Sequence, residues 1–131
     1  MEKYSFCSGS IIDRNFVITA GLCCIDEPPS RILAGLNDLA NSEDGAQKIA
    51  VDRVVPHPNY AVEKHTNDIS VLHSKEPLTL GNETRTAIIK LPWAGYVASG
   101  NANVSGWGFN LNDSSSKLMS ARVPIISDDE W

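Results

Sequence analysis

The sequence lacks a long hydrophobic run and an excess of positive charge, and each absence excludes a class of protein. The longest apolar run, Phe16 to Ile25, is interrupted by Thr19 and Gly21 and is too short to cross a bilayer. Eleven Lys and Arg residues stand against 16 Asp and Glu residues, which gives the 131-residue chain a formal net charge of −5. Because phosphate groups do not attract such a chain, we expect neither a nucleic acid nor a membrane as its partner.

The N-terminus also lacks a visible secretion signal. Residues 1–6 contain no basic segment followed by an apolar one. Three tripeptides nevertheless match the acceptor pattern for N-linked glycosylation, which matters only in a secreted chain. They are Asn82-Glu83-Thr84, Asn103-Val104-Ser105 and Asn112-Asp113-Ser114. We weigh Asn103 least, because it lies inside a predicted strand.

Cysteine is scarce and its number is odd. Cys7, Cys23 and Cys24 cannot all pair within one chain. Since a bridge between adjacent cysteines is strained, the residues alone leave Cys23 and Cys24 as alternative partners of Cys7. The third cysteine would stay free or pair with something outside this chain.

Motifs for metals and nucleotides are missing as well. The three histidines lie far from the cysteines and form no close ligand pair, so a zinc site is not expected. An acidic loop at Asp38, Glu43 and Asp44 is better explained by solvated turn residues than by a metal site. Gly106-Trp107-Gly108 is followed by no third glycine and no helix, so a nucleotide fingerprint fails. The sequence therefore predicts no metal and no cofactor.

What the sequence does contain is a series of short apolar and β-branched runs separated by turn residues, which indicates an all-β sandwich or barrel. The runs are Ser10–Ala20, Arg31–Ala34, Lys48–Val55, Ile69–His73, Ala102–Ser105 and Ala121–Ile126. No stretch keeps a sustained helical period. One turn at Thr19–Cys24 and a start at Ser127–Trp131 are the best helical candidates.

Four segments follow one another in an order that points to a known family. They are Phe6–Ile12 (Phe-Cys-Ser-Gly-Ser-Ile-Ile), Phe16–Cys23 (Phe-Val-Ile-Thr-Ala-Gly-Leu-Cys), His57–Tyr60 (His-Pro-Asn-Tyr) with Asn67–Leu72 (Asn-Asp-Ile-Ser-Val-Leu), and Val104–Gly108 (Val-Ser-Gly-Trp-Gly). In this order and spacing they resemble the N-terminal portion of the chymotrypsin-type (trypsin-like) serine proteases. The second segment, for example, is similar to the family's Trp-Val-Leu-Thr-Ala-Ala-His-Cys.

The resemblance implies a trypsin-like fold of two antiparallel Greek-key β-barrels with the active site between them. Residues 1–131 would form an incomplete serine protease domain: about 1–90 the first barrel without its first strand, and about 91–131 the start of the second. The resemblance also implies a disulfide between Cys7 and Cys23, and it implies a secreted protein. Cys24 would then have no partner in this chain.

The resemblance also implies positions for the catalytic triad. Asp68 matches the aspartate that orients the catalytic histidine, but the histidine position itself is occupied by Leu22. Leucine can neither accept nor donate a proton, so the general base is missing. We expect no replacement from His57 in a surface turn, from His65 on the wrong side of the carboxylate, or from His73 facing solvent.

Further departures from the family concern the serine and the chain ends. The family's Gly-Asp-Ser-Gly-Gly segment would lie beyond Val123–Trp131, and Ser114-Ser115-Ser116 has no such context. The family's Ile-Val-Gly-Gly terminus and first strand would precede Tyr4. Gly35 stands near the start of the loop that holds calcium in some trypsins, where a glutamate would be expected, so calcium is not expected either.

The sequence thus supports two main functional interpretations. In the first, the chain is a catalytically inactive homologue of serine endopeptidases, a secreted pseudoprotease that binds a protein or peptide. In the second, it is a fragment or incomplete gene model of a longer serine-type endopeptidase. A small adhesive or structural β-protein unrelated to proteases is disfavoured by the four ordered motifs. Nothing in the sequence specifies an oligomeric state.

Overall fold

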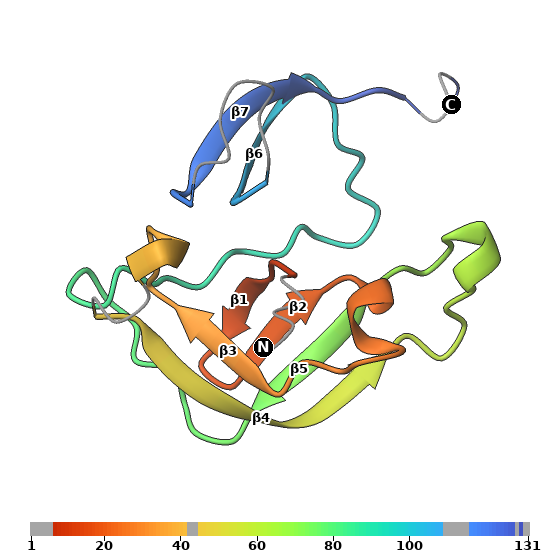
Figure 1. Cartoon of the computed structure of the whole chain (residues 1–131). Coiled ribbons are helices and arrows are strands. Elements are labelled where there is room, and N and C mark those ends of the chain that lie inside the picture. The colour runs from red at the N-terminus through yellow and green to blue at the C-terminus, as the bar shows by residue number, and fades with distance from the viewer. Residues whose placement is uncertain (1–6, 42–44, 109–115, 128, 130–131) are drawn as a thin grey trace. The chain divides into compact units, whose positions relative to one another are not determined.

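The computed structural model describes residues 7–41, 45–108, 116–127 and 129, and most of its regular structure is β-strand (Figure 1). The chain forms two compact units, residues 1–35 with 45–90 and residues 36–44 with 91–131. The first contains a five-stranded sheet that curls into half a barrel, and the second contains a two-stranded sheet. The predicted all-β, trypsin-like fold class is therefore confirmed. The predicted division into two barrels near residue 90 stays a prediction.

The first hairpin pairs β1 (Ser10–Asp13) with β2 (Phe16–Thr19). The sequence grouped Ser10–Ala20 as one apolar run, whereas the structure divides it at a turn. The backbone N–H of Asn15 donates to the Asp13 carboxylate at 3.3 Å, and such side-chain bonds favour turns over extended chain. The polar residues Asp13, Arg14 and Asn15 therefore form the end of β1 and a turn, although the residues on both sides are apolar.

The five-stranded sheet has the order β1-β2-β5-β4-β3, with every neighbouring pair antiparallel. Strand β3 spans Arg31–Ala34, β4 spans Gln47–Pro56 and β5 spans Ser70–Ser74. Each of them lies within two residues of the run that the sequence predicted. The turn residues that separated those runs therefore located the strand ends well.

The core of the first unit lies on the inner face of this sheet. Alternate residues of β2, β3 and β5 are buried, as expected where one face of a sheet packs and the other is solvated. Leu78, in the loop that follows β5, is the most deeply buried of the apolar side chains, with 1% exposure. The buried apolar residues of the cluster are Val17, Cys24, Ile32, Ala34, Leu72 and Leu78.

Strand β4 contains a β-bulge that changes which residues face the core. Val51 pairs with Ser74 and Arg53 pairs with His73, so Asp52 is the additional residue between them. The partly buried positions of β4 accordingly step by two up to Val51 and then by three to Val54. Bulges of this kind re-aim side chains locally.

The connections contain three short 3-10 helices within the described residues. They are η1 (Gly21–Cys24), η2 (Leu39–Asn41) and η3 (Val62–Lys64). The single turn predicted at Thr19–Cys24 is present as η1, and the helix start predicted at Ser127–Trp131 falls largely outside the described residues. In the part of the chain that the structure describes, no helix is long and apolar enough to cross a membrane.

The second unit is built on the hairpin of β6 (Asn101–Gly106) and β7 (Met119–Pro124). The segment that contains η2 is held in the same unit by backbone bonds, from Leu118 N–H to Asn37 O at 2.7 Å and from Leu39 N–H to Ser116 O at 2.8 Å. The indole N–H of Trp107 also donates to Asn37 O, at 3.1 Å. Tertiary contacts therefore join residues that are about seventy to eighty positions apart.

Asp38 secures this junction as a turn residue. Its carboxylate accepts hydrogen bonds from the Ser116 hydroxyl and from the Ala40 N–H, the latter at 3.0 Å. These two bonds, the Ser116 bond first, lower the pKa of Asp38 below its ordinary value of 3.8. The other two acidic residues of the loop, Glu43 and Asp44, lie outside the described residues.

Candidate active site

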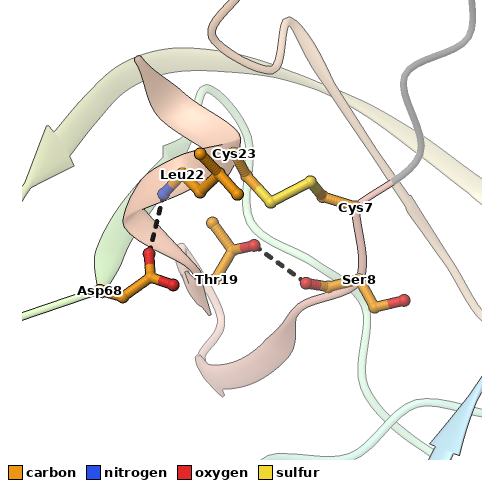
Figure 2. The surroundings of a disulfide bond; sticks show 6 residues. All are labelled: Cys7, Ser8, Thr19, Leu22, Cys23 and Asp68. Carbon is orange, nitrogen blue, oxygen red and sulfur yellow. Dashed lines mark hydrogen bonds between the residues drawn. A yellow bond between two sulfur atoms is a disulfide. The ribbon is translucent and has the colours of Figure 1, made fainter. Parts of the chain in front are cut away.

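The last residue of β2 and the η1 helix that follows are tied to residues 7 and 8 by a hydrogen bond and a disulfide (Figure 2). Cys7 and Cys23 are joined, with their Cα atoms 6.2 Å apart. This is the pair that the resemblance implied, and it leaves Cys24 free and buried. The Thr19 hydroxyl donates to Ser8 O at 2.9 Å, so both ends of the Thr19–Cys23 segment are anchored.

The backbone of Leu22, in η1, is joined to the side chain of Asp68, which precedes β5. The Leu22 N–H donates to Oδ1 of Asp68 at 2.9 Å (Figure 2). The Leu22 side chain takes no part in the bond, and this residue is 55% exposed. Asp68 is also exposed. The amide thus gives the carboxylate a hydrogen-bond donor, although no imidazole is present.

Asp68 is presented to η1 by a short irregular turn. The preceding residue, Asn67, adopts a left-handed conformation with φ of 55°, which asparagine tolerates better than most residues do. Its side-chain amide donates to Asn59 O at 3.0 Å, and its carbonyl accepts from Ile69 N–H at 2.8 Å. The asparagine therefore positions the aspartate at the entry to β5.

Tyr60 closes the other side of this site. Its backbone N–H donates to His57 O at 3.0 Å, while His57 N–H donates to Ile69 O at 2.9 Å. A Cβ atom on Gly21 would lie 3.2 Å from the Tyr60 ring and 3.3 Å from Oδ1 of Asp68. The Tyr60 ring and the Asp68 carboxylate thus both lie close to Gly21, the first residue of η1. Sequence reasoning treated Tyr60 only as part of a turn motif and missed this contact.

The Tyr60 hydroxyl is in an unfavourable position for ionisation. It is buried, and it has no hydrogen-bond partner among the described residues. Burial, followed by the negative charge of Asp68, raises the pKa of Tyr60 above its ordinary value of 10.0. Phenolate formation is thus coupled to the charge of Asp68.

We expect Asp68→Asn to lower the pKa of Tyr60 toward 10.0, since one of its two causes is removed. Because the folded pKa is raised, the folded chain keeps a proton above pH 10.0 that the unfolded chain releases, and stability falls as the pH rises through that window. Asp68→Asn should narrow this pH window, which extends from pH 10.0 to the pKa of Tyr60 in the folded chain. Phenolate absorbance against pH measures the pKa, with Tyr60→Phe to identify the signal. An unchanged pKa would show that the carboxylate does not act on the ring.

The three histidines give the Asp68 carboxylate no imidazole partner among the described residues. Within the described residues, none of the three forms a hydrogen bond with Asp68. The ring of His57 accepts the Asn59 N–H at its Nδ1 atom, at 3.1 Å. His65 is exposed and left-handed, with φ of 51°, at the end of η3. His57 is therefore hydrogen-bonded within its own turn, and His65 belongs to the loop that ends η3.

His73 differs from the expectation that it faces solvent. Its Nδ1 atom lies 2.6 Å from Oδ1 of Asp52, its ring packs edge-on against Phe16 at 5.0 Å between centroids, and 28% of its side chain is exposed. Sequence reasoning missed this pair because it depends on the bulge in β4. The bulge places Asp52 between the residues that pair with Ser74 and His73, and the sequence analysis did not predict it.

The remaining sequence candidates are not brought to this site. Ser116 is bonded to Asp38 in the second unit, and Ser114 and Ser115 lie outside the described residues. Across residues 7–41, 45–108, 116–127 and 129, no three His, Cys, Asp or Glu side chains gather as a metal site. The arrangement around Asp68 therefore comprises a carboxylate, a backbone amide and a buried phenol.

Comparison with known proteins identifies relatives along the whole chain. The family model described as Trypsin matches residues 1–131. Trypsin-1 of Astacus astacus is 37% identical over 135 residues, which cover 98% of this chain and 56% of the relative. Trypsin-1 of Salmo salar is 32% identical over 126 residues, covering 95% and 50%. Coagulation factor IX of Oryctolagus cuniculus is 33% identical over 128 residues, covering 93% and 46%. The chain thus spans about half the length of the curated relatives that it matches.

Proposed function

The chain belongs to the trypsin family, and on this premise we propose that it is a secreted homologue of serine endopeptidases that binds a protein or peptide without cleaving it. One observation carries the proposal: the Asp68 carboxylate accepts the backbone N–H of Leu22, at the position where the family resemblance implies a histidine. Leu22 is thus assigned to the place of the general base, and Asp68 to the orienting aspartate.

The chemistry explains why this substitution argues for inactivity. In a serine endopeptidase the histidine removes the proton from the nucleophile and returns it to the leaving amine. A leucine side chain can do neither, and a backbone amide nitrogen is not a general base, because its lone pair is delocalised into the carbonyl group. Loss of one triad member lowers turnover by orders of magnitude. In the folded chain the Leu22 amide supplies the exposed Asp68 carboxylate with a donor.

Secretion is proposed on two grounds. The Cys7–Cys23 disulfide is of a kind that persists in oxidising compartments. The relatives include trypsins and coagulation factor IX, which are typically secreted proteins. The net charge of −5 favours a protein or peptide ligand over a nucleic acid.

We expect the purified chain to show no turnover of denatured protein or peptide ester substrates above the buffer rate, because no general base stands beside Asp68. The chain should also fail to react with a fluorophosphonate, which labels an activated serine. Turnover that a serine-directed inhibitor abolishes would disprove the proposed inactivity. An active trypsin mixed with the chain serves as the control that the assay conditions support hydrolysis.

The assignment of Leu22 has its own test, which does not depend on activity. In a Leu22→His variant the new imidazole would lie beside the Asp68 carboxylate, and the opposite charge should raise its pKa. The matched control is the pKa of the same imidazole in a Leu22→His/Asp68→Asn variant, which lacks the carboxylate. NMR titration measures both. Equal values in the two variants would show that position 22 does not face the aspartate and would remove the basis for the proposal.

A second candidate is that this chain is part of a longer serine endopeptidase. The comparison supports it, since the chain covers only about half of each relative. Transcript sequencing across both ends of the reading frame separates the candidates. A continuation that encodes Gly-Asp-Ser-Gly-Gly would favour the longer protein, and with Leu22 retained we would still expect negligible turnover. Stop codons that close the frame would count against this second candidate.

A further inference from the structure

We propose that Asn82 is the site of an N-linked glycan. The proposal rests on the secretion argued above, but not on the assignment of Leu22 and Asp68. Asn82-Glu83-Thr84 carries the acceptor asparagine and the hydroxyl two residues later that this modification requires. The structure adds the position of the tripeptide, which distinguishes it from the Asn103 tripeptide.

Asn82 begins an exposed turn that is closed at its base. Gly81 and Thr86 form an isolated antiparallel bridge, with N···O distances of 3.0 and 3.3 Å. Across the turn itself, Arg85 N–H donates to Asn82 O at 3.2 Å. Asn82 and Glu83 are both exposed. The acceptor therefore lies on the exposed first residue of a small surface turn, as an accessible glycosylation site does.

A modification of this asparagine would disturb no contact of the loop. The Asn82 side chain makes no hydrogen bond within the described part of the chain, so a glycan on its amide nitrogen would break none. Asn82 is also exposed, so the glycan would displace no buried side chain of the loop.

Thr84 and Thr86 keep the loop in place from its inner side. The Thr84 hydroxyl lies 2.9 Å from Thr79 O, 3.0 Å from Gly81 O and 2.8 Å from the Thr86 hydroxyl. The Thr86 side chain is buried and also contacts Thr79 O, at 2.8 Å. Within the tripeptide, Thr84 thus anchors the loop from the inside, and the exposed Asn82 is available for modification.

Asn103 provides the contrast. It lies in the middle of β6 and pairs directly with Arg122 of β7, so its side chain stands next to a long cross-strand neighbour. Its third residue is Ser105, on the same face of the strand. A glycan on Asn103 would therefore lie on the same face of the β6–β7 sheet as the side chains of Arg122 and Ser105. We therefore assign the modification to Asn82 and not to Asn103.

The reaction requires a lipid-linked oligosaccharide pyrophosphate as the donor. The Nδ2 atom of Asn82 forms a bond to the anomeric carbon of the first sugar, and the bond between that carbon and the pyrophosphate oxygen breaks. Nδ2 loses one proton, and the lipid pyrophosphate leaves. No oxidation or reduction takes place, and the side chain becomes a secondary amide that is uncharged, as before.

The test is expression of the full 131-residue chain behind a secretory leader in cultured animal cells. Cell lysate and medium are both treated with an N-glycosidase and compared on gels. The peptide that contains residue 82 is then sequenced by mass spectrometry after deglycosylation in heavy-oxygen water. Asn82→Gln is the test variant and Asn103→Gln is its matched control. Including the lysate means that poor folding or export does not hide the modification.

We expect the wild type and Asn103→Gln to carry heavy-oxygen aspartate at position 82 and a glycosidase-sensitive mobility step. Asn82→Gln should lose that step. Unmodified asparagine at position 82 in wild-type protein from the lysate would overturn the proposal, and so would an Asn82→Gln variant that keeps the whole mobility step. Neither result bears on the peptidase assay or on the Leu22→His titration, so failure of the glycan proposal is distinguishable from failure of the proposed inactivity.

Discussion

Gly35→Ala is expected to destabilise the first unit more than the same change at Gly45. Both glycines have φ of +76°, in the left-handed region that disfavours any residue with a Cβ atom. That conformation costs alanine about 1–2 kcal/mol. At Gly35 a Cβ atom would also overlap the carbonyl oxygen of Thr84, which is a backbone atom and cannot rotate away. We therefore expect a loss of more than about 3 kcal/mol for Gly35→Ala.

Gly45→Ala is the matched control because it isolates the backbone conformation. The described atom nearest to its added Cβ would be a terminal nitrogen of Arg85 at 3.4 Å, the far end of a flexible side chain. Denaturant unfolding of the two variants measures the difference. Equal losses of unfolding free energy would mean that the Thr84 carbonyl moves away from the added Cβ atom easily. The close approach of the Thr84 loop to the end of β3 would then not contribute to stability. A larger loss at Gly35 would establish that approach as a structural contact.

Removal of the Cys7–Cys23 disulfide should cost about 3 kcal/mol, the size expected for a loop of its 16-residue separation. The bridge restricts the unfolded chain, and in the folded chain it holds η1 against the N-terminal segment. The double variant Cys7→Ala/Cys23→Ala removes it without leaving a thiol that could pair with Cys24. Denaturant unfolding of this variant against the oxidised wild type measures the loss.

Cys24→Ala serves as the control for the disulfide variant. It keeps the bridge and removes a buried sulfur from the core, so it should lose less stability than the double variant. If the double variant unfolds at the same denaturant concentration as the wild type, the bridge does not stabilise this chain. If Cys24→Ala prevents the bridge from forming, the pairing of Cys7 with Cys23 is wrong.

Local sequence signals located the strands because they act over a few residues. The run Arg31–Ala34 became β3 with the same bounds, since turn residues stand on both sides of it. The run Ser10–Ala20 was wrong as a single element, because the Asn15–Asp13 hydrogen bond forms a turn within it. Local polar chemistry there overrode the apolar pattern.

Part of the candidate site was visible in the sequence, and part was not. Leu22 and Asp68 were singled out by the motifs around them, and the structure brings them together through one hydrogen bond. The place of Tyr60 against Gly21 and the pair formed by His73 and Asp52 were missed. Each of these contacts joins residues from different loops or strands, and nothing in either segment alone specifies the other.

The sequence by itself determined the all-β fold class, most strand positions and the family, because β-branched runs, turn residues and motif order are local properties of the chain. The motifs around Leu22 and Asp68 indicated that a backbone amide of the Gly21–Leu22 turn could satisfy the Asp68 carboxylate, and only the tertiary structure decided which one does. Its partner, Leu22 N–H, lies 46 residues away. Such a meeting depends on strand register, on the pairing of β2 with β5 and on the left-handed turn at Asn67. These are set by packing of the whole sheet, and no single segment encodes them.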